Sequence, residues 1–128
     1  MQPTLLILLV EDDEGIRVLL QESLQEGGFE LAVAASGDEA LAALDARPTD
    51  FRGLITDVDL GQGPDGWEVA RRARELNPDL SVVYMSGASF ESWASRGVPH
   101  STMVSKPFAP AQILTAISAL LNTSDTRG

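Results

Sequence analysis

The sequence predicts an α/β fold in which a parallel sheet carries helices on both faces. Short apolar runs of strand length alternate with segments whose apolar residues recur at helical spacing, and this alternation continues along the whole chain. The connections are short, so each strand–helix–strand unit must cross over in the right-handed sense and place its helix on a face of the sheet. A length of 128 residues fits one such domain.

Five segments have the length and the apolar composition of buried strands. They are residues 5–10, 29–35, 53–57, 80–85 and 102–105. A helical pattern follows each of them. The helices are expected between Asp13 and Gly27 and at residues 38–46, 67–76, 90–97 and 110–121, the fourth with a short and poorly patterned signal. The domain therefore spans residues 1–121, and residues 122–128 form a polar tail.

Local signals fix several helix ends. Asp12 or Asp13 can cap the first helix, and Ser36 with Glu39 matches the capping box that opens the second. Pro110 fits the first turn of the last helix because its missing N–H has no partner to lose there. These signals agree with the strand and helix pattern of the chain.

Composition excludes several classes of function. The net charge of −10 repels phosphate backbones and anionic bilayers, so neither nucleic acid nor a membrane is an expected direct partner. Cysteine is absent, which rules out disulfides and thiolate metal sites. The first apolar run is too short to span a membrane, and acids follow it where a signal peptide would need small residues. We expect a cytoplasmic protein.

Polar residues stand at the carboxyl ends of four predicted strands. Asp12 and Asp13 follow the first strand, Asp57 ends the third, Ser86 follows the fourth and Lys106 follows the fifth. Parallel strands finish at the same edge of a sheet, where open α/β folds bind their ligands. We expect these side chains to converge although they are far apart in sequence.

This set of residues suits phosphoryl transfer. Three carboxylates in one crevice repel each other unless a cation neutralises them, and Mg²⁺ is the expected ion because it prefers oxygen ligands and needs few protein carboxylates. Asp57 could attack a phosphoryl group while Mg²⁺ and Lys106 stabilise charge on its oxygens. Ser86 could then donate a hydrogen bond to the transferred group.

Taken together, these motifs resemble the receiver domain of two-component response regulators, including the chemotaxis regulators, over residues 5–121. The resemblance implies a flavodoxin-like doubly wound sheet of five strands in the order 2-1-3-4-5. It also implies that Asp57 accepts phosphate from a sensor histidine kinase or phosphotransfer protein. Asp12, Asp13, Asp57 and the backbone carbonyl of Asp59 would bind Mg²⁺, with Asp13 as the more direct ligand.

The sequence departs from the receiver pattern in two places. In the loop after Asp57, Gly61 takes the position of a usual proline, and Asp65-Gly66 comes one residue late. The second departure is Met103, which stands where the family commonly has a Tyr or Phe that turns inward when the Ser or Thr moves to the phosphate. We expect Ser86 and Met103 to form the switch of this chain, with Met103 coupled to Ser86 through packing; the alternative is an output carried mainly by loop rearrangement.

The leading hypothesis is a stand-alone phosphoacceptor module without an output domain, which signals by a conformational switch to a binding partner. It is not an enzyme beyond accepting phosphate and slowly losing it to water. One alternative is a haloacid-dehalogenase-type phosphatase, because Asp57 and Asp59 partly match that family's Asp-x-Asp motif. Another is a pseudo-receiver that binds its partners without phosphate.

Overall fold

A computed structural model of the chain describes residues 5–87 and 90–127. The strands are β1 (Leu6–Val10), β2 (Glu30–Ala34), β3 (Gly53–Asp57), β4 (Ser81–Ser86) and β5 (Ser101–Ser105). The helices are α1 (Glu14–Glu26), α2 (Gly37–Ala46), α3 (Gly66–Leu76), a 3-10 turn η1 (Phe90–Ser92), α4 (Trp93–Arg96) and α5 (Pro110–Arg127). Three parts of the chain lie outside the residues that the structure describes. They are residues 1–4 of the predicted domain, residues 88–89 after the fourth strand and residue 128 of the predicted tail.

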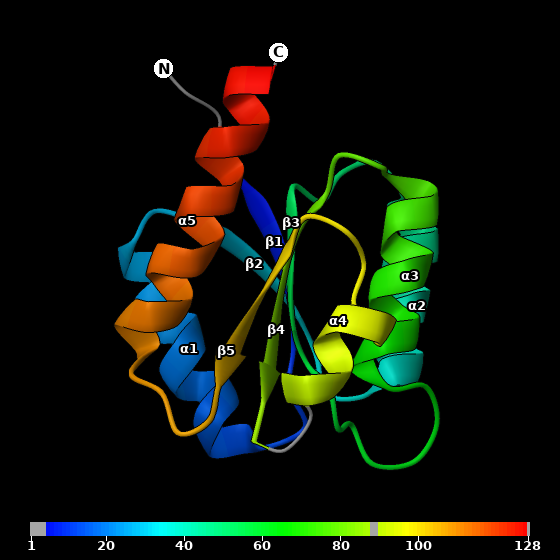
Figure 1. The fold of residues 1–128 in the computed structure, drawn as a ribbon. Helices are drawn as coiled ribbons and strands as arrows, with labels where there is room; N and C mark the ends of the chain where they lie inside the picture. Colours follow the sequence, from blue (N-terminus) through cyan, green and yellow to red (C-terminus); the bar gives the residue numbers. More distant parts are fainter. Residues whose placement is uncertain (1–4, 88–89, 128) are drawn as a thin grey trace.

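The five strands form one parallel sheet in the order β2-β1-β3-β4-β5. This confirms the doubly wound, flavodoxin-like topology, and each strand lies within one residue of its predicted bounds. All five strands run the same way, so their carboxyl ends share one edge (Figure 1). The residues that follow the strands therefore meet at that edge.

Helices cover both faces of the sheet. Helices α1 and α5 lie on one side, and α2, α3 and α4 lie on the other (Figure 1). Successive strand residues point to opposite faces, so the core divides into two clusters. Leu20, Leu24, Ile113 and Ile117 pack on one face of the sheet, and Ala40, Leu44, Trp67 and Ala70 pack on the other.

Side-chain caps start the first three helices. Asp13, Ser36 and Asp65 each accept a hydrogen bond from a backbone N–H three residues later, at 3.0–3.1 Å. Glu39 reaches back to the N–H of Ala35 at 3.0 Å, which completes the predicted reciprocal cap of α2. The start of each of these helices is therefore fixed close to the carboxyl end of a strand.

The structure differs from the sequence prediction at two helices. Residues 90–97 form a 3-10 turn and a single α-helical turn, and α4 has no buried residue. A short helix is stabilised mainly by an apolar face, which explains why the sequence pattern of residues 90–97 is weak.

Helix α5 continues beyond Leu121 to Arg127, through residues that we expected to be a tail. Residues 122–127 are polar but include neither glycine nor proline, so nothing in them ends the helix.

Among the described residues, no helix combines the length and the apolar character needed to cross a membrane.

Candidate functional site

The ends of β3, β4 and β5 bring Asp57, Ser86 and Lys106 together. Asp57 is the last residue of β3 and Ser86 the last of β4, and both are buried, with 5 % and 2 % of their surface exposed. The ammonium Nζ of Lys106 donates a hydrogen bond to Oδ2 of Asp57 at 3.0 Å. The backbone N–H of Lys106 donates to the carbonyl of Ser86 at 2.8 Å. The predicted convergence of these three residues is therefore present.

A cluster of carboxylates lies beside this group. Glu11, Asp12 and Asp57 each place a carboxylate oxygen within 4.8 Å of the other two. The backbone N–H of Glu11 donates to Ala34 and so continues the hydrogen-bond ladder of β1 by one residue. Glu11 is fully buried, and Arg17 holds its carbonyl oxygen at 2.9 Å.

Asp13 lies outside this cluster, in contrast to the position expected for the more direct metal ligand. Its carboxylate accepts a hydrogen bond from the N–H of Ile16 at 3.0 Å and caps α1. Its own N–H donates to Oε1 of Glu11 at 3.1 Å. The carboxylate of Asp13 is thus engaged by the backbone of α1, and Glu11 stands with Asp12 and Asp57 in the carboxylate cluster where Asp13 was expected. Sequence reasoning missed Glu11. Its position directly after the first apolar run is the signal that could have found it.

The loop after Asp57 comes close to the strand end. Gly61 and Gly63 adopt left-handed backbone conformations with φ of +76° and +86°, which favour glycine. A Cβ atom on Gly66 would lie 2.2 Å from the carbonyl oxygen of Asp57, so only glycine fits there. Glycines therefore allow the loop between Asp57 and Gly66 to turn and to return to the end of β3. The Asp59 side chain on this loop is exposed to solvent.

Burial dominates the electrostatics of the acids. Desolvation, with the charge of Asp57 adding to it, raises the pKa of Glu11 to about 7. Desolvation also raises the pKa of Asp57, although the Lys106 ammonium and the backbone N–H of Asp59 act in the opposite direction. Each carboxylate is therefore held in a site that disfavours its charged form.

Lys106 responds in the opposite sense. Burial lowers the pKa of its ammonium, but the hydrogen bond and charge of Asp57, together with the charge of Glu11, outweigh this effect and raise it above its ordinary value. The Nζ atom lies 3.6 Å from Oε2 of Glu11. One ammonium thus faces two buried carboxylates. The peptide bond between Lys106 and Pro107 is cis.

The residues present fit a hard divalent cation. Oε2 of Glu11 is buried and accepts no hydrogen bond, although the ammonium of Lys106 is its ionic neighbour. Buried polar oxygens are rarely left without a hydrogen bond. The neighbouring carboxylates of Asp12 and Asp57 are oxygen donors of the kind that Mg²⁺ prefers. A cation bound among these three oxygens would relieve both the repulsion and the missing interaction.

Met103 lies on β5 directly beside Tyr84 of β4 in the sheet register. Both residues are buried, Met103 with 8 % of its surface exposed. Tyr84 contacts α3 through Trp67, with 4.7 Å between the ring centroids. Sequence reasoning singled out Met103 and overlooked Tyr84, because only the strand register brings the two residues side by side.

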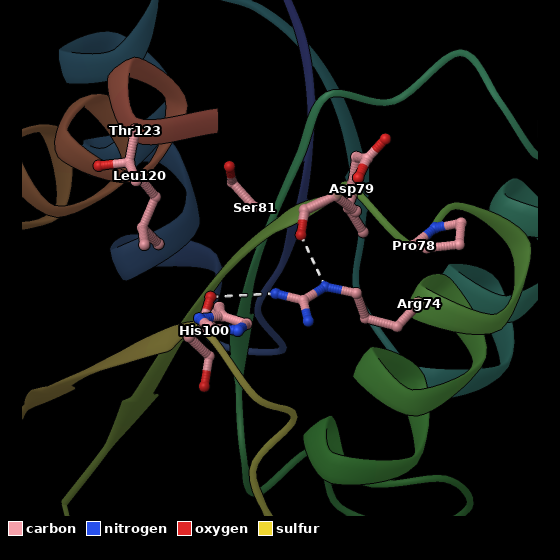
Figure 2. Close-up of a pocket in the computed structure, with 9 residues that line it drawn as sticks. Arg74, Pro78, Asp79, Ser81, His100, Leu120 and Thr123 are labelled. Atoms are coloured by element: carbon pink, nitrogen blue, oxygen red, sulfur yellow. Dashed lines mark hydrogen bonds between the residues drawn. The ribbon is translucent and has the colours of Figure 1, made fainter. Parts of the chain in front are cut away.

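A separate cavity of about 160 Å³ lies at the opposite edge of the sheet, where β4 and β5 begin. Figure 2 shows the guanidinium of Arg74 pointing toward the backbone around it. The guanidinium donates to the carbonyl oxygens of Leu80, Pro99 and His100. None of the site residues predicted from the sequence lines this cavity. The guanidinium of Arg74 is already paired with carbonyl oxygens, so we place the functional site at the carboxyl edge.

Fold and site together define a receiver domain, and comparison with known families agrees. Residues 7–118 match the model of the response regulator receiver domain. The chain therefore belongs to the response regulator receiver family, and it is a receiver domain of the two-component systems. The acidic cluster of Glu11, Asp12 and Asp57 fits the phosphoacceptor site of such a domain.

Individual relatives point the same way. The chain is 33 % identical to the response regulator receiver protein CpdR of Brucella abortus, over 90 % of this chain and 95 % of CpdR. It is 30 % identical to the sensor kinase CckA of the same organism, over 93 % of this chain but only 13 % of the kinase. The crystal structure of a receiver protein from Sinorhizobium medicae WSM419 has a TM-score of 0.90 at 40 % identity, covering 94 % of this chain and 97 % of that one.

Proposed function

We propose that Asp57 is the phosphoacceptor and that it takes its phosphoryl group from a phosphohistidine on a sensor histidine kinase or phosphotransfer protein. One observation carries the proposal: the carboxylate of Asp57 is buried between the ammonium of Lys106 at 3.0 Å and the carboxylates of Glu11 and Asp12. A nucleophile is thereby held among groups that can bind and neutralise a phosphoryl group. The same proposal places the protein in the cytoplasm, as the sequence predicts.

The transfer step uses groups that the strand ends bring together. A carboxylate oxygen of Asp57 attacks phosphorus, and a P–O bond forms as the P–N bond of the donor breaks. The leaving imidazole nitrogen takes the electron pair of that bond. Lys106 donates to an oxygen of the arriving phosphoryl group, and the hydroxyl of Ser86, which ends the adjacent strand, donates to another.

We propose that Glu11, Asp12 and Asp57 hold Mg²⁺, with the backbone carbonyl of Asp59 as a further ligand. The support is the distance of 4.8 Å or less between the three carboxylates and the absence of a hydrogen bond to Oε2 of Glu11. When bound, the ion would supply positive charge to the oxygens of the phosphoryl group in addition to that of Lys106. Asp13 is assigned to capping α1 and not to the metal.

The proposed output is a conformational switch that changes the affinity for a partner protein. Phosphorylation adds charge at a buried site and so biases the equilibrium between two arrangements of the domain. The chemistry is limited to accepting the phosphoryl group and losing it slowly to water. The exposed side chain of Asp59 lacks the enclosed position that a general acid of a phosphatase would need.

Incubation with Mg²⁺ and acetyl phosphate tests the proposal. We expect intact-mass spectrometry to show one added phosphoryl group on the unaltered chain and none on Asp57→Asn, and we expect beryllofluoride to shift the backbone NMR signals of Ser86 and Lys106. Asp45→Asn, on the exposed surface of α2, serves as the control and should be phosphorylated normally. An unaltered chain that neither gains mass nor responds to beryllofluoride would overturn the assignment. Steady turnover of a phosphate ester would instead favour the phosphatase alternative.

A further inference from the structure

The single tyrosine of the chain occupies a central position between the site and α4. Tyr84 lies on β4, is fully buried, and pairs in register with Met103 of β5. Met103 is the position where receiver domains commonly carry an aromatic ring, so this chain has its aromatic residue one strand away. Methionine has no hydroxyl and cannot donate a hydrogen bond. A polar connection at this place in the sheet must therefore come from Tyr84.

The hydroxyl of Tyr84 makes such a connection. It accepts a hydrogen bond from the backbone N–H of Val98 at 3.0 Å, and this bond is buried. Val98 follows α4 after one intervening residue, Gly97. The ring of Tyr84 also packs on Trp67 of α3 at an interplanar angle of 55°. Tyr84 is therefore held by its ring on one side and bound to the end of α4 on the other.

Helix α4 has no fully buried residue; Trp93 packs on the core from a half-buried position, and polar contacts add to this attachment. The indole N–H of Trp93 donates to the hydroxyl of Ser101 at 2.9 Å, in a half-buried setting. Arg96 forms an exposed ion pair with Asp65 at 3.5 Å. Exposed ion pairs contribute little, whereas a buried hydrogen bond is costly to break. The contact with Tyr84 is thus the best protected of these three connections.

Tyr84 is also close to the phosphoacceptor site along the chain. Ser86 lies two residues further on the same strand, so both side chains point to the same face of the sheet. The carbonyl of Ser86 accepts the N–H of Lys106. Packed interiors shift as units and do not deform freely. Ser86 and Tyr84 are therefore placed so that a displacement of one would act on the strand that carries the other.

We propose that Tyr84 is the positioning residue that couples the phosphoacceptor site to α4 in this chain, in place of an aromatic residue at position 103. When Ser86 moves toward a phosphoryl group on Asp57, the end of β4 moves with it. The Tyr84 hydroxyl changes its bond to Val98, and α4 is released or repositioned. This inference rests on the proposed role of Asp57, and the experiment separates the two.

A fluorine label reports on Tyr84 alone, because the chain has one tyrosine. The full chain is grown with 3-fluorotyrosine, and its single ¹⁹F resonance is followed while Mg²⁺ and beryllofluoride are added. We expect the resonance to shift in the unaltered chain and not in Asp57→Asn. A resonance that stays fixed while the backbone signals of Ser86 and Lys106 shift would overturn the coupling role of Tyr84 and leave the phosphoacceptor intact. If neither responds, the proposed function itself fails.

A conservative variant tests whether the hydroxyl matters. Tyr84→Phe keeps the ring and removes only the acceptor of the Val98 N–H, which stabilises the arrangement seen here. We expect beryllofluoride to bind roughly fivefold more tightly, since one net hydrogen bond no longer opposes the switch. We also expect the amides of α4 to exchange faster with solvent.

A control separates coupling from general loosening. Asn77→Ala removes a half-buried hydrogen bond to Phe51 at the opposite edge of the sheet and should leave the beryllofluoride affinity unchanged. If Tyr84→Phe also leaves the affinity unchanged, Tyr84 has only a structural role. The proposal is likewise overturned if Asn77→Ala raises the affinity as much as Tyr84→Phe does.

Discussion

The two edges of the sheet differ in how their charged side chains are paired. At the carboxyl edge, the buried carboxylates of Glu11 and Asp57 share one ammonium, that of Lys106. At the amino edge, the guanidinium of Arg74 faces a cavity of about 160 Å³ but is bonded to three carbonyl oxygens. The cavity beside Arg74 therefore lies at one edge, and the unbalanced buried charge lies at the other. Burying charged groups without full pairing costs folding free energy. Such a cluster therefore indicates a functional site more reliably than the volume of a cavity does.

Removing the ammonium should produce the largest change. In Lys106→Met, we expect phosphorylation by acetyl phosphate to slow roughly a hundredfold, because the positive charge beside the transferring group is lost. Mg²⁺ should bind more tightly, since no protein cation then competes for the carboxylates. Phosphorylation is followed by intact-mass spectrometry and Mg²⁺ binding by calorimetry. Arg47→Met is the control and should change neither quantity, because Arg47 is an exposed cation that follows α2 directly and pairs with Asp50. Normal phosphorylation of Lys106→Met would remove Lys106 from the mechanism.

The carboxyl edge should also make stability depend on pH when Mg²⁺ is chelated. The pKa of Glu11 is raised to about 7 in the fold, so the folded state retains a proton that the unfolded chain releases near pH 4.5. The free energy of unfolding should therefore fall as pH rises from about 4.5 to 7, by up to about 3 kcal/mol. Urea unfolding across this range measures it, and Glu11→Gln should flatten most of the slope. A profile that rises with pH in the unaltered chain would contradict the buried state of Glu11.

Substitution of the three consecutive acids should distinguish the metal ligands Glu11 and Asp12 from the helix cap Asp13. We expect Asp12→Asn and Glu11→Gln to weaken Mg²⁺ binding at least roughly tenfold, because each removes a negative charge close to the ion. Asp13→Asn should leave binding nearly unchanged, since asparagine also caps helices, whereas Asp13→Ala should cost about 1 kcal/mol of stability. Calorimetry and urea unfolding measure the two effects. Weaker Mg²⁺ binding in Asp13→Asn than in Asp12→Asn would return the ligand role to Asp13.

The amino edge should affect stability alone. Arg74→Met removes the donors to Leu80, Pro99 and His100, and we expect a loss of about 1–2 kcal/mol in the free energy of unfolding. Phosphorylation and Mg²⁺ affinity should stay within about twofold of the unaltered chain, because Arg74 lies at the far edge. Urea unfolding and the acetyl phosphate assay measure both. A strong loss of phosphorylation would show that the two edges are coupled.

Much of the fold and part of the site could be predicted because they follow from local patterns. Apolar runs and glycine or proline punctuation placed all five strands within one residue. Asp57, Ser86 and Lys106 were found because each directly ends or follows a strand. Residues 90–97 were the weakest prediction, because a single side chain of α4, Trp93, packs on the core, and one apolar residue gives no helical periodicity.

By itself, the sequence determined that acidic residues, a hydroxyl and an amine would gather at one edge of a parallel sheet. Only the tertiary structure decided that Glu11 enters the crevice while Asp13 caps α1. It also decided that Tyr84 lies beside Met103. The physical reason is that the first arrangement depends on how the chain turns from β1 into α1, and the second on the register between β4 and β5. A run of like residues in the sequence reveals neither of them.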